Sequence, residues 1–68
     1  MDKNDFSFGT YVRVVKGALA DKVYKVFYIA DYSLGVGIGD IATDIVYMDD
    51  VEITTEKDFN QSNEDLLK

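Results

Sequence analysis

Carboxylates are the side chains of this sequence that are numerous enough, and spaced closely enough, to do chemistry. Thirteen Asp and Glu stand against seven Lys and Arg in 68 residues, for a formal net charge of −6. Residues 29–68 hold ten of these acids and two cations, whereas residues 1–28 hold three acids and five cations. An acidic half of this kind steers basic partners and repels nucleic acid, although acids can also serve only to keep a small domain soluble.

Catalysis and metal binding find little support in these residues. The chain has no Cys and no His, which excludes disulfides, thiol nucleophiles and thiolate or imidazole metal ligands. Asp49, Asp50 and Glu52 are close in sequence, but their spacing matches no twelve-residue calcium loop. The glycines of residues 35–39 lack the Lys and the following helix of a phosphate loop. We therefore expect a protein that is not an enzyme, with no catalytic residue, no metal site and no cofactor.

Acidic residues and tyrosines together form the first candidate binding surface, which we expect to contact a protein partner. Its members are Asp31, Tyr32, Asp40, Asp44, Tyr47, Asp49, Asp50 and Glu52. Tyrosine suits such a surface because its ring buries a large area while its hydroxyl can still form a hydrogen bond. The competing interpretation is that the acids maintain solubility and the rings cover the ends of a barrel.

The carboxylates also suggest a second function, mimicry of a nucleic acid. Acids spaced along strands and turns could stand where the phosphates of a duplex stand, and so occupy the groove of a DNA- or RNA-binding enzyme. Phage inhibitors of restriction and of CRISPR enzymes are proteins of this type. A short, acidic chain without cysteine suits an accessory protein of a phage or mobile element.

Direct nucleic-acid binding through a basic first hairpin is the third candidate function. The residues that would carry it are Tyr11, Arg13, Lys16, Lys22, Tyr24 and Lys25. Cations would contact phosphates and the rings would offer stacking surfaces for bases. Four cations are few, however, and the acidic remainder of the chain would oppose a polyanion, so this function is the least favoured of the three.

Short strands must position these side chains. Runs of β-branched and aromatic residues predict strands over residues 10–16, 23–29, 34–39, 41–47 and 51–53. In the first strand, Val12 and Val14 share one face. The second strand is largely apolar on both faces, which indicates a central strand or one that contains a bulge.

The segment 34–39 alternates aliphatic residues with glycines, so one of its faces is apolar and the other has no side chains. We expect a sharply curved strand whose bare face lies under another backbone segment or a large aromatic ring. Curvature of this kind is what allows a small sheet to roll into a barrel.

The chain divides into a lead-in of residues 1–8, a β-domain of residues 9–53 and a polar tail of residues 54–68. A phenylalanine of the lead-in is expected to pin that segment to the domain. In the tail, Ser62 and Asp65 have the spacing of a weak helix start, so a short helix and a disordered tail both stay open.

Five short strands with no helix among them predict an all-β fold, a small, partly open, five-stranded barrel. The stretch Gly9 to Gly17, followed by Val23 to Val26 and Ile29, resembles the opening of KOW and related Src-homology-three-like barrels. Residues 46–53, with a tight acidic turn before a short last strand, resemble their close. The resemblance covers residues 9–53 and implies an Src-homology-three-like barrel. Asp21 and Tyr24 replace glycines of the usual KOW pattern, so the nucleic-acid binding of many KOW domains is not carried over.

Hydropathy and strand edges bear on location and assembly. No apolar run approaches the roughly 18 residues of a membrane span, and no signal-peptide core is recognisable, so we expect a cytoplasmic protein without a membrane partner. An open edge on the glycine-containing or the last strand would allow a homodimer through strand pairing.

Overall fold

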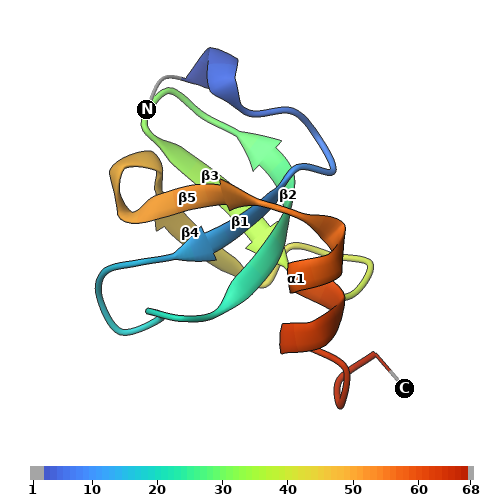
Figure 1. Cartoon of the computed structure of the whole chain (residues 1–68). Helices are drawn as coiled ribbons and strands as arrows, with labels where there is room; N and C mark the ends of the chain where they lie inside the picture. The colour runs from blue at the N-terminus through green and yellow to red at the C-terminus, as the bar shows by residue number, and fades with distance from the viewer. Residues whose placement is uncertain (1–2, 68) are drawn as a thin grey trace.

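The computed structural model describes residues 3–67, which form a five-stranded antiparallel sheet with a short helix packed against it (Figure 1). The strands are β1 (Tyr11–Val14), β2 (Val23–Ile29), β3 (Ser33–Gly37), β4 (Asp44–Tyr47) and β5 (Val51–Thr54). Two 3₁₀ turns, η1 (Lys3–Asp5) and η2 (Met48–Asp50), precede β1 and β5, and helix α1 (Glu56–Ser62) follows β5. Met1, Asp2 and Lys68, the outermost residues of the predicted lead-in and tail, lie outside the described residues.

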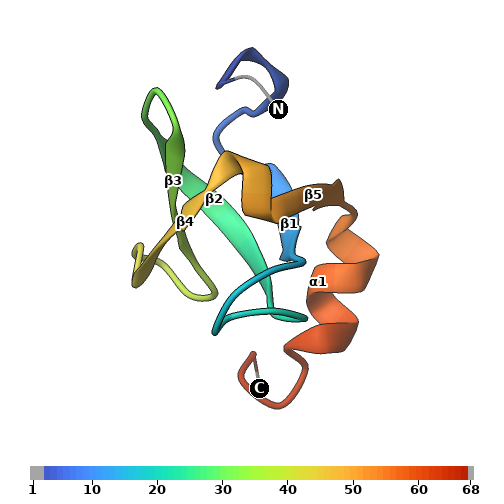
Figure 2. The same ribbon diagram turned by 90° about the vertical axis from the view of Figure 1, so that its left-hand side faces the viewer.

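The all-β, barrel-like fold predicted from the sequence is confirmed. The strand order is β4-β3-β2-β1-β5, so β5 returns past the sheet to pair with β1, with Val14 opposite Val51. This return gives the sheet its barrel-like curvature (Figure 2). Among the described residues the sheet does not close, and β4 and β5 form its two edges.

The inner face of the sheet, which carries Val12, Val26 and Leu34, holds the main hydrophobic core. Residues opposite one another on paired strands share a face, which places Tyr24 beside Val12 in this core. The core consists of Phe6, Val12, Val14, Tyr24, Val26, Leu34, Val36, Val46, Met48 and Val51.

The two phenylalanines of the lead-in have different environments. Phe6 is buried in the core, whereas Phe8 is 75% exposed. The expected attachment of the lead-in to the domain is therefore made by Phe6.

Strand β2 is both central and bulged, so both features that its apolar faces suggested are present. It pairs with β1 on one side and β3 on the other, and its register with β3 shifts between Val26 and Tyr28. Because the bulge changes which residues face inward, Val26 lies in the core, Ile29 packs against it, and Tyr28 is turned outward.

The bare face of β3 is covered in the two ways that the glycine pattern predicted. A Cβ atom on Gly35 would stand 2.9 Å from Cδ2 of the Tyr28 ring, and one on Gly37 would collide with the carbonyl oxygen of Ile41. Strand β3 ends at Gly37 and β4 begins only at Asp44, so the strands predicted over 34–39 and 41–47 are too long. The reason is that the chain from residue 38 to residue 43 folds back over Gly37.

Helix α1 packs on the outer face of β1 and β2, the face opposite the core. The ring of Phe59 lies 4.9 Å from that of Tyr11, and Nδ2 of Asn63 donates a hydrogen bond to the carbonyl of Val23 at 2.8 Å. The helix begins after Thr55, whose hydroxyl accepts a hydrogen bond from the backbone N–H of Asp58.

The sequence left open whether the tail forms a short helix or is disordered, and the structure shows the helix. Its expected start was wrong, because Ser62 is the last helical residue and not the cap that precedes the first.

Replacement of Gly37 should destabilise the fold, because a methyl group at this position meets backbone and not a movable side chain. We expect Gly37→Ala to lower the free energy of unfolding by about 1–3 kcal/mol, the usual cost of overpacking. Gly39→Ala is the matched control, since a Cβ there meets nothing within 4 Å. Urea denaturation of both variants measures the effect, and equal stability of the two would contradict the proposed contact with Ile41.

Loss of the Asn63 side chain should loosen the helix from the sheet. Asn63→Ala removes the donor to Val23, and we expect it to cost about 1–3 kcal/mol of unfolding free energy. Asn60→Ala, at an exposed position of the same helix, should be close to neutral. Thermal unfolding followed by circular dichroism compares the two, and a similar loss in both would argue against docking through Asn63.

Candidate functional site

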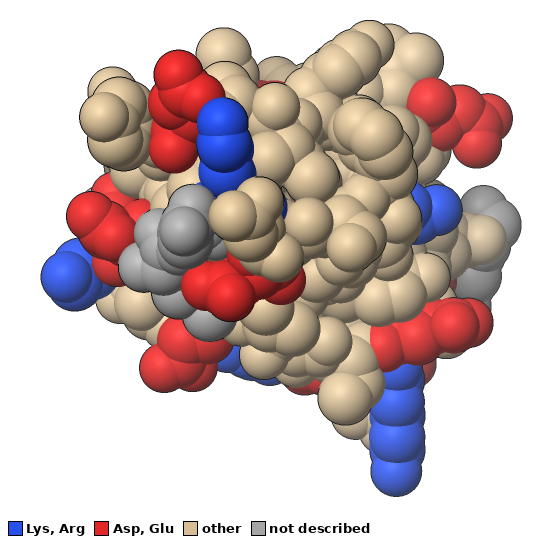
Figure 3. Space-filling view, turned by 90° about the horizontal axis from the view of Figure 1, so that it is seen from above, with Lys and Arg blue, Asp and Glu red and all other residues tan. Residues whose placement is uncertain are grey.

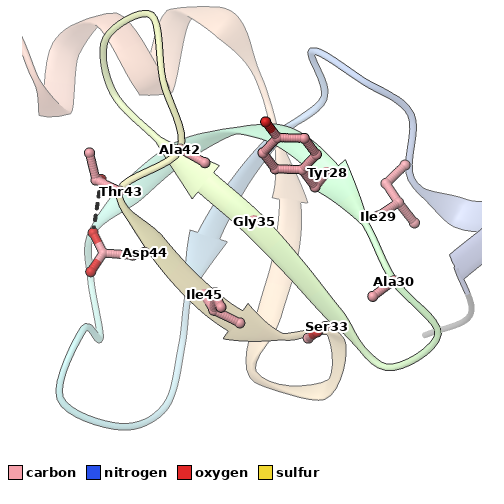
Figure 4. A pocket seen from close by; sticks show the side chains of 9 residues that line it. All are labelled: Tyr28, Ile29, Ala30, Ser33, Gly35, Ala42, Thr43, Asp44 and Ile45. Carbon is pink, nitrogen blue, oxygen red and sulfur yellow. Dashed lines mark hydrogen bonds between the residues drawn. The ribbon is translucent and has the colours of Figure 1, made fainter.

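Helix α1 packs on β1 and on the start of β2, and it leaves the outer face of β3, of β4 and of the end of β2 uncovered (Figure 2). This face carries a hollow of about 650 Å³. The residues that line it come from the three strands and their connections, and are Tyr28, Ile29, Ala30, Ser33, Gly35, Ala42, Thr43, Asp44 and Ile45 (Figure 4).

Strand register explains why the hollow exists. Gly35 of β3 lies opposite Tyr28 of β2 on one side and opposite Ile45 of β4 on the other. Tyr28 and Ile45 therefore project on either side of a position without a side chain (Figure 4). Both remain largely in solvent, with 67% of Tyr28 and 75% of Ile45 exposed. Exposed rings and aliphatic groups gathered on one face are typical of an interaction site.

Asp44 lies at the end of this hollow, but its side chain is on the opposite face of the sheet from Ile45, because Asp44 pairs with the core residue Val36. Its carboxylate accepts a hydrogen bond from the hydroxyl of Thr43 at 3.1 Å (Figure 4). It also lies beside Tyr24: burial raises the pKa of the Tyr24 hydroxyl, and the charge of Asp44 and a hydrogen bond to its carboxylate raise it further. These contacts hold the Asp44 carboxylate in one orientation.

Part of the predicted protein-binding surface is gathered at one end of the sheet. Tyr32 lies in the β2–β3 turn, and its carbonyl accepts a hydrogen bond from the N–H of Met48 at 3.0 Å. Ser33 pairs with Tyr47, so both tyrosines and the neighbouring residues Asp31 and Asp49 belong to this end. We call Asp31, Tyr32, Tyr47 and Asp49 the turn-end cluster. Tyr32 and Tyr47 are both exposed.

The other predicted acids lie elsewhere. Asp40 is in the β3–β4 connection, Asp44 is at the hollow, and Glu52 lies on β5 opposite Arg13. Asp50 is half-buried in η2, and its carbonyl accepts a hydrogen bond from Val15. Figure 3 shows acidic side chains separated by uncharged surface, with basic side chains among them.

Most residues of the predicted nucleic-acid surface of the first hairpin make contacts within the fold. Tyr24 is only 2% exposed and cannot stack on a base, which corrects its assignment as a stacking residue. Tyr11 packs on Phe59, and the guanidinium of Arg13 binds both carboxylate oxygens of Asp58. Lys16 and Lys22 are exposed, and the ammonium of Lys25 lies 5.9 Å above the ring of Phe27.

Of the residues that line the hollow, Ile45 was missed by sequence reasoning, whereas Tyr28 is one of the five tyrosines from which the sequence also predicts an aromatic, peptide-binding groove. The signal for Tyr28 was present, because the glycine-containing strand was expected to lie against a large ring. Ile45 shares a face of its strand with Tyr47 by alternation, but alternation alone does not tell which face is turned to solvent.

Neither a metal cluster nor a membrane-spanning helix is found in the described part of the chain. Among residues 3–67, no three carboxylates are grouped closely enough to hold a metal ion. The helix found in this part of the chain is too short and too polar to cross a membrane.

Comparison of the chain with family models, with curated proteins and with solved structures finds no match.

The ion pair between Arg13 and Asp58 should make stability depend on pH. The hydroxyl of Thr54 and the guanidinium of Arg13 hydrogen-bond to Asp58 and lower its pKa below the ordinary value of 3.8. Because the pKa is lower in the folded state, the contact stabilises the fold above the ordinary value, and this gain is lost as the pH falls through the folded-state pKa. We expect the difference in urea midpoint between wild type and Asp58→Asn to be present at pH 7 and to shrink below about pH 4. Glu56→Gln on the same helix is the control, and a difference that persists unchanged at pH 2 would contradict the assignment.

Proposed function

We propose that the protein is a non-enzymatic binding module that contacts a protein partner through an acidic, tyrosine-containing surface. This surface comprises the turn-end cluster and the adjoining outer face of β2, β3 and β4. The observation that carries the proposal is the exposure of Tyr28, Ile45 and Tyr47 on a face beyond the reach of α1. Such side chains supply most binding energy when a partner removes them from water.

The origin and location of the protein form part of the same proposal. Size and composition support an accessory protein of a phage or mobile element that acts in the cytoplasm. Kinship with KOW and Src-homology-three-like barrels is proposed on the resemblance of residues 9–53 alone.

The other two functions have less support. Direct nucleic-acid binding would need Tyr24 and Arg13, which are engaged by burial and by Asp58. Mimicry of a duplex would need carboxylates in rows, whereas the acids visible in Figure 3 are scattered. We therefore keep mimicry as an outcome to be tested.

Affinity capture from a bacterial lysate, with the tagged protein and with nuclease present, tests the proposal. We expect a retained protein partner whose affinity falls at least tenfold, about 1.4 kcal/mol, when Tyr32→Ala and Tyr47→Ala are combined. Asp49→Lys should weaken it as well. Leu66→Ala is the matched control, because Leu66 is 68% exposed and lies beyond α1.

Three results would contradict the proposal. Retention that is indifferent to the turn-end substitutions would place the contact elsewhere. Displacement of the partner by added duplex DNA would indicate mimicry. Loss of the retained material on nuclease treatment would indicate that the basic residues of the first hairpin bind nucleic acid.

A further inference from the structure

Strand β4 has two residues whose backbone groups face no neighbouring strand. Among the described residues, β4 lies at an edge of the sheet and pairs with β3 alone (Figure 2). The N–H of Met48 donates a hydrogen bond to the carbonyl of Tyr32, so these two residues form a hydrogen-bonded pair. Such pairs alternate along an antiparallel ladder, which makes Val46 the next residue of β4 that bonds to β3. The N–H and C=O groups of Ile45 and Tyr47 therefore point away from β3.

Apart from its short length, this edge lacks the features that usually keep a further strand from pairing. The register of β4 with β3 is regular from Asp44 to Tyr47, and the strand contains no Pro and no Lys. At the other edge of the sheet, the N–H of Val51 in β5 already donates to the carbonyl of Met48. Of the two edges, β4 is therefore the more open to an added strand.

A second hollow, of about 210 Å³, lies beside the edge of β4, and we call it the edge hollow. Strand β4 lines one side of it, and residues 16–19 of the β1–β2 connection line another. Within residues 3–67, no backbone hydrogen bond joins that connection to β4. The core residues Val14 and Val46 also line the edge hollow, so it reaches the inner face of the sheet.

A strand added to β4 would use both features. Opposite residues of paired strands share a face, so the residues opposite Ile45 and Tyr47 would lie on the outer face beside these exposed side chains. The residue between them would lie opposite Val46 on the inner face, next to the edge hollow. Because Val14, Leu19 and Val46 give this hollow an apolar lining, an aliphatic side chain suits the inward position.

The backbone groups and the edge hollow together favour a peptide segment over other occupants. A second copy that paired through its own β4 would bring Val46 to the inward position, but this side chain is 5% exposed and packs in its own core. A small molecule would fill the edge hollow without pairing with the backbone of β4. Nucleic acid does not present N–H and C=O groups at the spacing of a strand. Of the residues that line the edge hollow, Lys16 is basic and Asp50 is acidic, so charge does not select the occupant.

We infer that the edge of β4 binds an extended segment of the partner protein as an additional strand. The N–H and C=O groups of Ile45 and Tyr47 bond to the backbone of this segment, and an aliphatic side chain opposite Val46 enters the edge hollow. This inference rests on the proposed function, because it states how the partner is held at the same surface, to which Ile45 and Tyr47 belong.

Selection of peptides from a displayed random library, with the purified protein as target, supplies the probe. We expect enriched peptides to share an aliphatic residue that is flanked on both sides by β-branched or aromatic residues.

Backbone N-methylation of an enriched synthetic peptide, one residue at a time, is the first test, with binding measured by fluorescence anisotropy. Methylation of the residues opposite Ile45 and Tyr47 removes donors to β4, and we expect it to weaken binding at least tenfold. Methylation of the aliphatic residue between them should have little effect, because its N–H points away from β4. This alternation needs no variant of the protein.

The variant Ile45→Pro is the second test. Proline is tolerated in an edge strand where the N–H faces away from the neighbouring strand, and a urea midpoint like that of wild type shows that the variant is folded. We expect Ile45→Pro to weaken peptide binding at least tenfold, Ile45→Ala to weaken it less, and Leu66→Ala to leave it unchanged.

Amide hydrogen exchange on the wild-type protein locates the peptide without any substitution. Bound peptide should slow the exchange of the N–H groups of Ile45 and Tyr47. The N–H of Ile53 is the matched control, because the hydrogen bond from Val15 to Asp50 fixes the alternation on β5 and turns Ile53 away from β1.

Several outcomes would overturn the inference. These are a selection that enriches no peptide, N-methylation effects that do not alternate, unchanged affinity in folded Ile45→Pro, and protection of Ile53 in place of Ile45 and Tyr47. A dimer in sedimentation equilibrium that Ile45→Pro dissociates would assign the edge to a second copy.

The inference and the proposed function can fail separately. If the captured partner tolerates Ile45→Pro but is lost with the turn-end substitutions, no strand is added at β4 and the binding module stands. If the captured partner is indifferent to both, the proposed function fails as well.

Discussion

The absence of side chains on the outer face of β3 is the constraint around which the molecule is arranged. At Gly37 the chain from residue 38 to residue 43 folds back so closely that a Cβ has no room, and this close approach ends the strand. At Gly35 the ring of Tyr28 occupies the space, and the bulge in β2 turns that ring outward while Ile29 returns to the core. The same two glycines therefore set the length of β3, the path of the next connection and the floor of the hollow.

The position of helix α1 follows from the same constraint. On the outer face of β1 and β2, the ring of Tyr11 packs on Phe59 of the helix. Arg13 pairs with Asp58, and the backbone carbonyl of Val23 accepts a hydrogen bond from Asn63. The bare strip of β3 offers a helix no side chain to pack against. The outer face is thus divided into a half that the helix covers and a half that it leaves exposed.

Local patterns predicted those features that depend on neighbours in the chain. The burial of Val12 and Val14, the bulged β2 and the covered face of β3 all follow from alternation and from glycine spacing. The start of the helix did not follow, because Thr55 with Asp58 and Ser62 with Asp65 have the same spacing, and the packing of Phe59 on Tyr11 selects the first. The ion pair of Arg13 could not be predicted from local patterns either, since its partner Asp58 is 45 residues away in the chain.

The folded structure changes the interpretation of how charge is distributed along the chain. Arg13 of the basic half is neutralised by Asp58 under the helix, so the first hairpin offers less positive surface than its composition suggests. The stretch without Lys or Arg, residues 26–56, contains all of β3 and β4 and therefore the half of the outer face beyond α1. In space this half also meets cations, because Lys3 pairs with Asp31 at 3.0 Å and Lys25 of β2 lies opposite Gly37 on the outer face.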